Sequence, residues 1–358
     1  MKKLNVAILG QGRSGWGIHG KYLQTDTERF TVVAVVDKMA ERREKAERTF
    51  GCKTYEDYTE LFGRTDIDLV VNALPSWYHA PVTIDLLKHG FNVLTEKPVG
   101  YVPEDIDAEI AAAKESGKMV AFFQQSRLAP YFKKIKEVLA SGVLGRVIEI
   151  DINFGGWARR WDWQTVQEYN AGNLYNTGPH PVDQALNLLD YYDGMPNILC
   201  KMDIANSFGD AEDYCKIIMT APDRPLIDLT ISSCNAYPFG TYNIQCEFGG
   251  LWCNLSEVKW KYFDPKEAPE QHLIRTPLSK PDGEPAYCSE TLPWKEGHWV
   301  AGEMDTPFHA AVRDKYTNLY EHLTEGKELI IKPEQVRQQL AVIRECHRQN
   351  PLPRMDQK

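Results

Sequence analysis

The feature that most constrains the fold of this chain is a glycine-rich turn near the N-terminus. The run LNVAIL at residues 4–9 has the aliphatic composition of a strand buried in a parallel sheet. Gly10, Gly12 and Gly15 follow in the spacing G-x-G-x-x-G, and a predicted helix then extends to about residue 27. Between a strand and a helix, such glycines allow a tight turn, close approach of a diphosphate and close helix packing. The pattern predicts a dinucleotide-binding unit, although the glycines taken alone would indicate only a turn.

Apolar strand-like runs continue to alternate with helical stretches after this turn. FTVVAVVD, DLVVNALP, FNVLTEKP and MVAFFQQ each precede or follow a predicted helix. This alternation indicates right-handed βαβ units in a doubly wound parallel sheet. A chain of 358 residues is also long for one core, so we predict a Rossmann domain at residues 1–125 and a second domain at residues 126–358.

The second part of the chain no longer shows the regular alternation of predicted strands and helices. Several short strand-like runs between residues 147 and 256 predict an α+β domain built on an open, mostly antiparallel sheet. Residues 261–300 are rich in proline and aromatic residues and predict a long loop or lid-like excursion. Helices are expected at about 181–189, 308–325 and 333–348.

Composition excludes several classes of partner. The net charge of −9 argues against nucleic acid or an anionic membrane as the main partner. No apolar run approaches the roughly 18 residues of a membrane span, and glycines interrupt the first apolar run too early for a signal peptide. The eight cysteines are scattered, and no grouping has metal-ligand spacing, so we expect reduced thiols, no metal and a cytoplasmic protein.

An acidic residue ends the second predicted strand. Asp37 lies 22 residues after Gly15, where a carboxylate accepts hydrogen bonds from the ribose hydroxyls of a dinucleotide. It would repel a 2′-phosphate, which favours NAD(H) over NADP(H). The nearby cations Lys38, Arg42 and Arg43 keep NADP(H) open, because such a cluster can receive a phosphate.

A lysine ends the fourth predicted strand in the sequence Glu96-Lys97-Pro98. Open α/β sheets bind ligands at the carboxyl ends of their strands. Proline disfavours helical dihedrals in the residue before it, so Lys97 is expected to be extended at the crevice. A lysine alone is usually a solvated charge, but this position makes Lys97 a candidate catalytic residue.

Four segments of the chain form a familiar combination. They are GQGRSGWGIHG at 10–20, NALPSWYHAPVTIDLLKHGFNVLTEKPVG at 72–100, QQSRLAPYFKKIKEVLASGVLGRV at 124–147 and GNLYNTGPHPVDQAL at 172–186. Together they resemble the glucose–fructose oxidoreductase / inositol dehydrogenase (Gfo/Idh/MocA) family, and the Glu-Lys-Pro element with a downstream Gly-x-His-x-x-Asp is the most specific match. The resemblance implies NAD(P)-dependent redox chemistry on a sugar, cyclitol or related polyol, and a C-terminal sheet that often serves in oligomer contacts.

The resemblance also implies roles for individual residues. His79 and Arg127 match family positions that line the cofactor crevice, although each could be structural; Arg127 is a candidate for substrate contact. The cofactor-binding set is Gly10, Gly12, Arg13, Ser14, Gly15, Asp37, Leu74, Pro75, His79, Glu96, Lys97 and Gln125.

His180 begins a predicted helix within the Gly-x-His-x-x-Asp motif, and the resemblance makes it the base that takes a hydroxyl proton. Family members commonly have aspartate four residues earlier, where this chain has Asn176. An amide can bind a hydroxyl but cannot raise the basicity of the histidine by charge. Either Asn176 only positions the substrate, or the proton leaves through Lys97, Asp183 or water. Asp183 is expected to orient the helix more than to titrate.

A tryptophan-rich stretch, WARRWDWQ at residues 157–164, precedes this motif. Flat aromatic faces suit sugar rings, and charged side chains suit hydroxyls, so Arg160 and Trp163 join Asn176 and Asp183 as substrate candidates. A packed aromatic cluster between domains is the alternative. Lys97 would polarise the reacting oxygen and stabilise its developing charge.

Together with the resemblance, these features predict an NAD-dependent dehydrogenase that oxidises a secondary hydroxyl of a sugar, glycoside or cyclitol; the resemblance and the aromatic residues of the second domain favour C3 of a glucoside. One alternative retains NAD through a full cycle, as a sugar–sugar oxidoreductase or a redox-elimination glycosidase. Another is a non-catalytic, NAD-responsive regulator. We expect a homo-oligomer acting on a small molecule.

Overall fold

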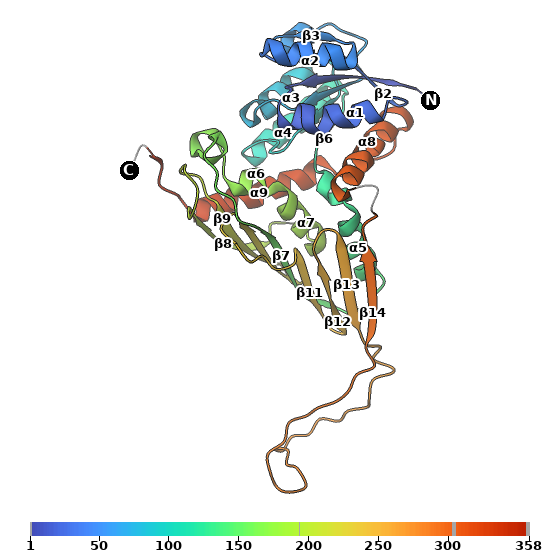
Figure 1. Cartoon of the computed structure of the whole chain (residues 1–358), viewed down its shortest axis with the longest axis vertical. Helices are drawn as coiled ribbons and strands as arrows, with labels where there is room; N and C mark the ends of the chain where they lie inside the picture. The colour runs from blue at the N-terminus through green and yellow to red at the C-terminus, as the bar shows by residue number, and fades with distance from the viewer. Residues whose placement is uncertain (1, 193, 303–305, 356–358) are drawn as a thin grey trace.

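The computed structural model describes residues 2–192, 194–302 and 306–355. Its N-terminal part is a parallel sheet of six strands in the order β3-β2-β1-β4-β5-β6, which confirms the predicted doubly wound sheet (Figure 1). Aliphatic side chains bury its central strand β1 almost completely, as expected for a strand with helices on both faces. The strands are β1 (Leu4–Leu9), β2 (Phe30–Val36), β3 (Lys53–Tyr55), β4 (Leu69–Asn72), β5 (Val93–Thr95) and β6 (Val120–Phe122).

The helix after the glycine turn differs from the expected single α-helix. Residues Gly15–Gly20 form a π-helical turn, which continues into the short helix α1 at Lys21–Thr25. The other helices of this part agree with the predicted alternation. They are α2 (Ala40–Phe50), α3 (His79–Lys88) and α4 (Pro103–Ser116).

The second sheet has eight strands in the order β14-β13-β12-β11-β7-β10-β9-β8. Only β7 and β10 pair in parallel; the other neighbours are antiparallel, which confirms the predicted open, mostly antiparallel sheet. Its strands are β7 (Val147–Gly155), β8 (Asn197–Asp203), β9 (Tyr214–Thr220), β10 (Leu226–Ser232), β11 (Tyr242–Cys246), β12 (Gly249–Cys253), β13 (Glu257–Tyr262) and β14 (Lys295–Val300).

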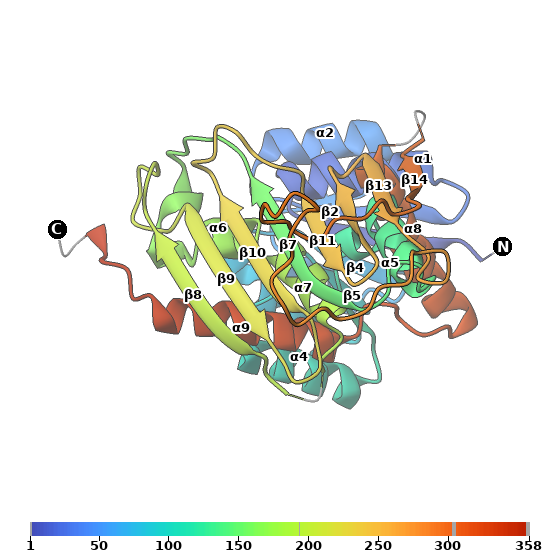
Figure 2. The ribbon, with the colours of Figure 1, turned by 90° about the horizontal axis from the view of Figure 1, so that it is seen from below.

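Helices cover the face of this sheet that is turned toward the first sheet, and the opposite face is uncovered by any helix of the described residues (Figures 1 and 2). Helices α7 and α9 lie between the two sheets, where α9 contacts both α4 and β8. The helices are α5 (Pro130–Ala140), α6 (Asn173–Asn176), α7 (Pro179–Leu189), α8 (Pro307–Glu325) and α9 (Pro333–Gln349).

Helix α8 returns to the first sheet. Its Tyr316, Leu319 and Tyr320 are buried against Phe30 and the neighbouring strands. A helix from the C-terminal part of the chain therefore completes one layer of the Rossmann unit. The division into residues 1–125 and 126–358 stays a proposal.

The proline-rich excursion is shorter than predicted. Residues 295–300 form the edge strand β14 on β13, and the alternating exposure of KEGHWV explains this pairing. Residues 263–294 project from the end of the second sheet that lies away from the first sheet (Figure 1), so they do not cover the cleft described below. Among the described residues, no helix combines the length and apolar character needed to span a bilayer.

Candidate active site

A cleft of about 640 Å³ runs between the carboxyl edge of the first sheet and the segment that joins β7 to α6. It brings together most of the residues that we predicted for cofactor and substrate. The predicted residues that line it are Gly10, Gly12, Arg13, Ser14, Asp37, Leu74, Pro75, His79, Glu96, Lys97, Arg160, Trp163 and Asn176.

The three glycines of the turn have distinct steric surroundings. Gly10 has φ of +82°, and a Cβ there would lie 2.5 Å from the carbonyl oxygen of Ala73. A Cβ on Gly15 would lie 1.9 Å from the carbonyl oxygen of Gly10. At Gly12, by contrast, no atom of the described chain other than those of Gly12 and its two neighbours in sequence lies within 4 Å of that position, and the residue lines the cleft. The turn is closed on the protein side and open on the ligand side, which fits a bound diphosphate.

Asp37 lies directly after β2 and is buried beside the glycine turn. Its Oδ2 accepts a hydrogen bond from the backbone N–H of Gln11 at 2.7 Å, and its Oδ1 accepts one from Met39 at 2.9 Å. Lys38 and Arg42 line the same end of the cleft. Arg43 instead donates to the backbone carbonyl groups of Asp37 and Lys38. A carboxylate that would receive a ribose therefore stands next to two cations that would receive a phosphate.

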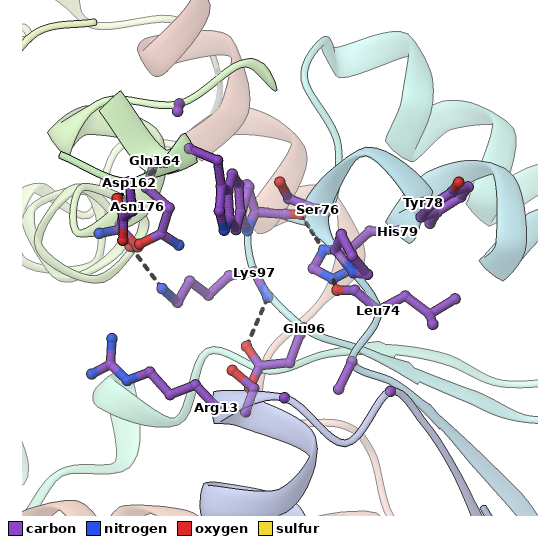
Figure 3. A pocket seen from close by; sticks show the side chains of 18 of the residues that line it. Arg13, Leu74, Ser76, Tyr78, His79, Glu96, Lys97, Asp162, Gln164 and Asn176 are labelled. Carbon is purple, nitrogen blue, oxygen red and sulfur yellow. Dashed lines mark hydrogen bonds between the residues drawn. The ribbon is translucent and has the colours of Figure 1, made fainter. Parts of the chain in front are cut away.

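Lys97 follows β5 and reaches across the cleft to the second part of the chain (Figure 3). Its Nζ donates a hydrogen bond to the backbone carbonyl oxygen of Asn176 at 2.7 Å. Burial lowers the pKa of this ammonium; Glu96 opposes the shift, and the charges of Arg13 and Arg160 add to it. Lys97 thus lies where the two parts of the chain meet, and its ammonium has a lower pKa than a lysine in water.

Glu96 and His19 form a buried support behind Lys97. Glu96 Oε2 accepts a hydrogen bond from the backbone N–H of Lys97 at 3.0 Å, and its Oε1 lies 3.1 Å from His19 Nε2. The other ring nitrogen of His19 lies 2.8 Å from the hydroxyl oxygen of Tyr316. Burial alone would raise the pKa of Glu96, but the hydrogen bond and charge of His19 together with the charge of Lys97 lower it. Sequence reasoning missed His19 and Tyr316, since no local pattern joins them.

His79 links two segments at the carboxyl edge of the sheet. Its Nδ1 lies 2.7 Å from the carbonyl oxygen of Pro98 and its Nε2 lies 2.8 Å from that of Leu74. Burial lowers its pKa. The ring thereby holds the segment after β4 against the segment after β5, and both segments line the cleft.

His180 stands at the start of α7. Its Nδ1 lies 3.1 Å from Ser126 Oγ, and burial together with the charge of Lys97 lowers its pKa to about 3. The imidazole is therefore neutral at ordinary pH and able to accept a proton, although it is a weak base. The described residues that line the cleft do not include His180.

The substrate end of the cleft is polar. Arg160 Nη2 donates to Asp162 Oδ2 at 2.7 Å and also bonds Gln164 Oε1. Asp162, Gln164 and Asn176 lie together across from Lys97 (Figure 3). Asp162 and Gln164 are additional candidates that the sequence contained, within WARRWDWQ, but that we did not single out.

Arg127 and Asp183 form a buried ion pair. Arg127 Nε donates to Asp183 Oδ2 at 2.9 Å, and the guanidinium also bonds the second carboxylate oxygen and Gln335. The described residues around the cleft include neither of them, nor Gly15 and Gln125. The geometry supports a structural role for this pair, and contact with substrate stays a prediction.

Within the described part of the chain, one group of carboxylates has side chains close enough to share an ion: Glu149, Asp151 and Asp228 on β7 and β10. It belongs to the second sheet, away from the residues of the cleft. Lys216 forms an ion pair with Asp228, and Asn243 donates to Asp151 at 3.1 Å. Local partners thus already compensate part of its charge.

The fold and the cleft together define a two-part dinucleotide-binding protein of Rossmann type. Residues 4–124 match the family described as "Oxidoreductase family, NAD-binding Rossmann fold", and residues 132–252 match the "GFO/IDH/MocA C-terminal domain". The chain belongs to the GFO/IDH/MocA oxidoreductase family, as the sequence motifs predicted.

Curated relatives include the D-glucoside 3-dehydrogenase of Escherichia coli, 28% identical over 52% of this chain and 54% of that protein. The 2,7-anhydro-N-acetylneuraminate hydratase of Mediterraneibacter gnavus is 26% identical over 72% of this chain and 69% of that protein. This chain spans about half to two thirds of the length of the first relatives that it matches. The crystal structure of an NAD-binding protein from Listeria innocua has the same fold, with a TM-score of 0.78, 23% identity and coverage of 98% of this chain and 99% of that one.

Proposed function

We propose that this protein is an NAD-dependent dehydrogenase that oxidises a secondary hydroxyl of a sugar, glycoside or cyclitol. The observation that carries the proposal is that Lys97 bridges the dinucleotide cleft to Asn176 at its polar end. Family membership and relatives named as a glucoside dehydrogenase and as inositol dehydrogenases support the substrate class.

Gly10, Gly12, Arg13, Ser14 and Asp37 would hold the dinucleotide, with Leu74, Pro75 and His79 along its length. When bound, the nicotinamide supplies the acceptor for the hydride that leaves the substrate carbon. We favour NAD because Asp37 lines the cleft directly after β2, where a carboxylate is expected to receive a ribose, whereas Lys38 and Arg42 are the features that would favour NADP.

The residues of the chain then handle the proton and the charge. The Lys97 ammonium donates a hydrogen bond to the reacting oxygen and stabilises the negative charge that develops there. His180, kept neutral by burial, accepts the hydroxyl proton. Because the pKa of His180 is low, we expect Lys97 to share in this transfer: its ammonium would pass a proton to His180 as it takes up the proton of the hydroxyl. Asn176, Arg160 and Asp162 orient the hydroxyls of the ring.

We favour C3 of a glucoside as the oxidised position, in line with the relative from Escherichia coli. A cycle in which the cofactor is reduced and reoxidised on the enzyme is the second candidate, and the hydratase relative is the observation that favours it. We further propose a cytoplasmic homo-oligomer, using the uncovered face of the second sheet for subunit contacts.

The test is a panel of free sugars, inositols and glycosides, followed by absorbance of the reduced cofactor and by mass spectrometry of the products. Oxidation predicts a product two mass units lighter with one equivalent of reduced cofactor. A product of unchanged oxidation state without net reduction would establish the second candidate. The absence of any reaction across the panel, with the cofactor bound, would contradict both.

A further inference from the structure

Three aromatic side chains from distant parts of the chain meet beside the cleft. Trp77 precedes α3, whereas Trp163 and Tyr169 belong to the segment between β7 and α6. The ring centroids of Trp77 lie 5.3 Å from Trp163 and 5.2 Å from Tyr169, and Trp163 lies 6.5 Å from Tyr169. We call these three residues the aromatic rim.

The rim borders the cleft itself. Trp163 lines the cleft, and so do Ser76 and Tyr78 on either side of Trp77 and Asn170 next to Tyr169. Trp163 stands between Asp162 and Gln164, which lie beside Asn176 (Figure 3), so the rim joins the two sides of the opening near the place where Lys97 meets Asn176.

All three rings of the rim are partly exposed to solvent. Trp77 is 37% exposed, Trp163 39% and Tyr169 37%. Contiguous exposed apolar surface beside a polar cleft commonly marks a ligand-binding site. The polar side chains of Arg160, Asp162 and Gln164 come from the same segment and face the ring hydroxyls in the proposed function.

We propose that the aromatic rim is a second subsite, which binds a flat, largely apolar group joined through a glycosidic bond to the sugar being oxidised. This inference rests on the proposed function. The polar side chains of Arg160, Asp162 and Gln164 would bind the hydroxyls of the monosaccharide. An aryl aglycone would instead stack on the three aromatic rings, which are otherwise exposed to water. Binding energy from this remote part would raise kcat/KM for aryl glycosides.

The experiment compares phenyl β-D-glucoside with methyl β-D-glucoside, which differ only in the aglycone. The enzymes are the wild type, Trp77→Ala, Tyr169→Leu and the control Tyr287→Ala, which removes an aromatic ring that is 95% exposed in the excursion. Calorimetric titration of both glucosides and of NAD gives a readout independent of turnover, and thermal unfolding checks folding.

We expect the wild type and the control to prefer the phenyl glucoside by about fivefold or more in kcat/KM and in affinity. Both rim variants should lose most of this preference while their use of the methyl glucoside and their affinity for NAD change by less than about twofold. An equal loss on both glucosides would show that the rim only holds the domains together. Weakened NAD binding would assign it to the cofactor.

The outcomes separate this inference from the proposed function. If glucosides are oxidised but the phenyl preference is absent, or is unchanged in the variants, the second subsite is wrong and the dehydrogenase stands. If no sugar, cyclitol or glycoside is oxidised, the dehydrogenase is wrong. In that case the titrations still test the second subsite. The subsite requires that the wild type bind the phenyl glucoside more tightly than the methyl glucoside, and that Trp77→Ala lose this difference.

Discussion

Replacing Lys97 with methionine tests the chemistry most sharply, because the change removes the ammonium and keeps the length of the side chain. The Nζ of Lys97 is held 2.7 Å from the carbonyl oxygen of Asn176 in the cleft. A single donor aimed at a developing oxyanion lowers the activation free energy by about 2.7–4 kcal/mol, so its removal should reduce kcat by roughly 10²–10³.

Folding should not suffer from the same change. Burial already lowers the pKa of Lys97, which means that the folded state disfavours its charge. Methionine removes this cost, although it leaves Glu96 without the nearby positive charge. We therefore expect an apparent Tm within about 3 °C of the wild type and an NAD affinity within about threefold.

The assay is the initial rate of cofactor reduction on the best substrate of the panel, with fluorescence titration of NAD and thermal unfolding on the same preparations. Lys266→Met, on the exposed excursion, is the matched control and should retain full activity. Activity of Lys97→Met within tenfold of the wild type would refute the assigned role. A loss explained entirely by NAD affinity would refute it equally.

Three further predictions concern His180 and Asp37 of the proposed site and Lys315 on α8. Since the pKa of His180 is about 3, kcat/KM should show no acid inflection near pH 6.5, and Asn176→Asp should move the acid limb upward; a wild-type inflection at 6.5 would contradict this. Asp37→Ala should weaken NAD binding and improve the relative affinity for NADP in parallel titrations, because Lys38 and Arg42 remain; an unchanged ratio would exclude the ribose contact. Burial lowers the pKa of Lys315 to about 7, and its Nζ has no hydrogen-bond partner within the described chain. The unfolded chain therefore binds this proton more tightly, so stability should rise between about pH 7 and 10 by up to roughly 4 kcal/mol. In Lys315→Met, the Tm should no longer show this rise between about pH 7 and 10, and at pH 7 it should be higher than the Tm of the wild type. Thermal unfolding of both proteins at the two pH values checks this.

Local sequence patterns determine much of the nucleotide-binding part of the chain, so the sequence predicts that part well. The glycine turn and the strand ends at Asp37 and Lys97 depend on residues close together in the chain. The boundary of β14 was missed because proline and aromatic residues on both sides hide a short edge strand. Its pairing with β13 is what makes it a strand.

The support of the site depends on contacts that sequence patterns do not encode. His19 and Tyr316 meet only because α8 returns to the first sheet. The ion pair of Arg127 with Asp183 likewise forms between separate elements. Both arrangements arise from tertiary packing, for which neither periodicity nor spacing gives a signal.

The central claim is that Lys97 and His180 serve the direct transfer of hydride from a secondary alcohol carbon. The most direct measurement is a single turnover with the best panel substrate deuterated at the reacting carbon, followed by mass spectrometry of the cofactor. The account predicts reduced cofactor carrying one deuterium in the wild type and almost none formed by Lys97→Met in the same time. Reduced cofactor without deuterium, or equal labelling by the variant, would contradict it.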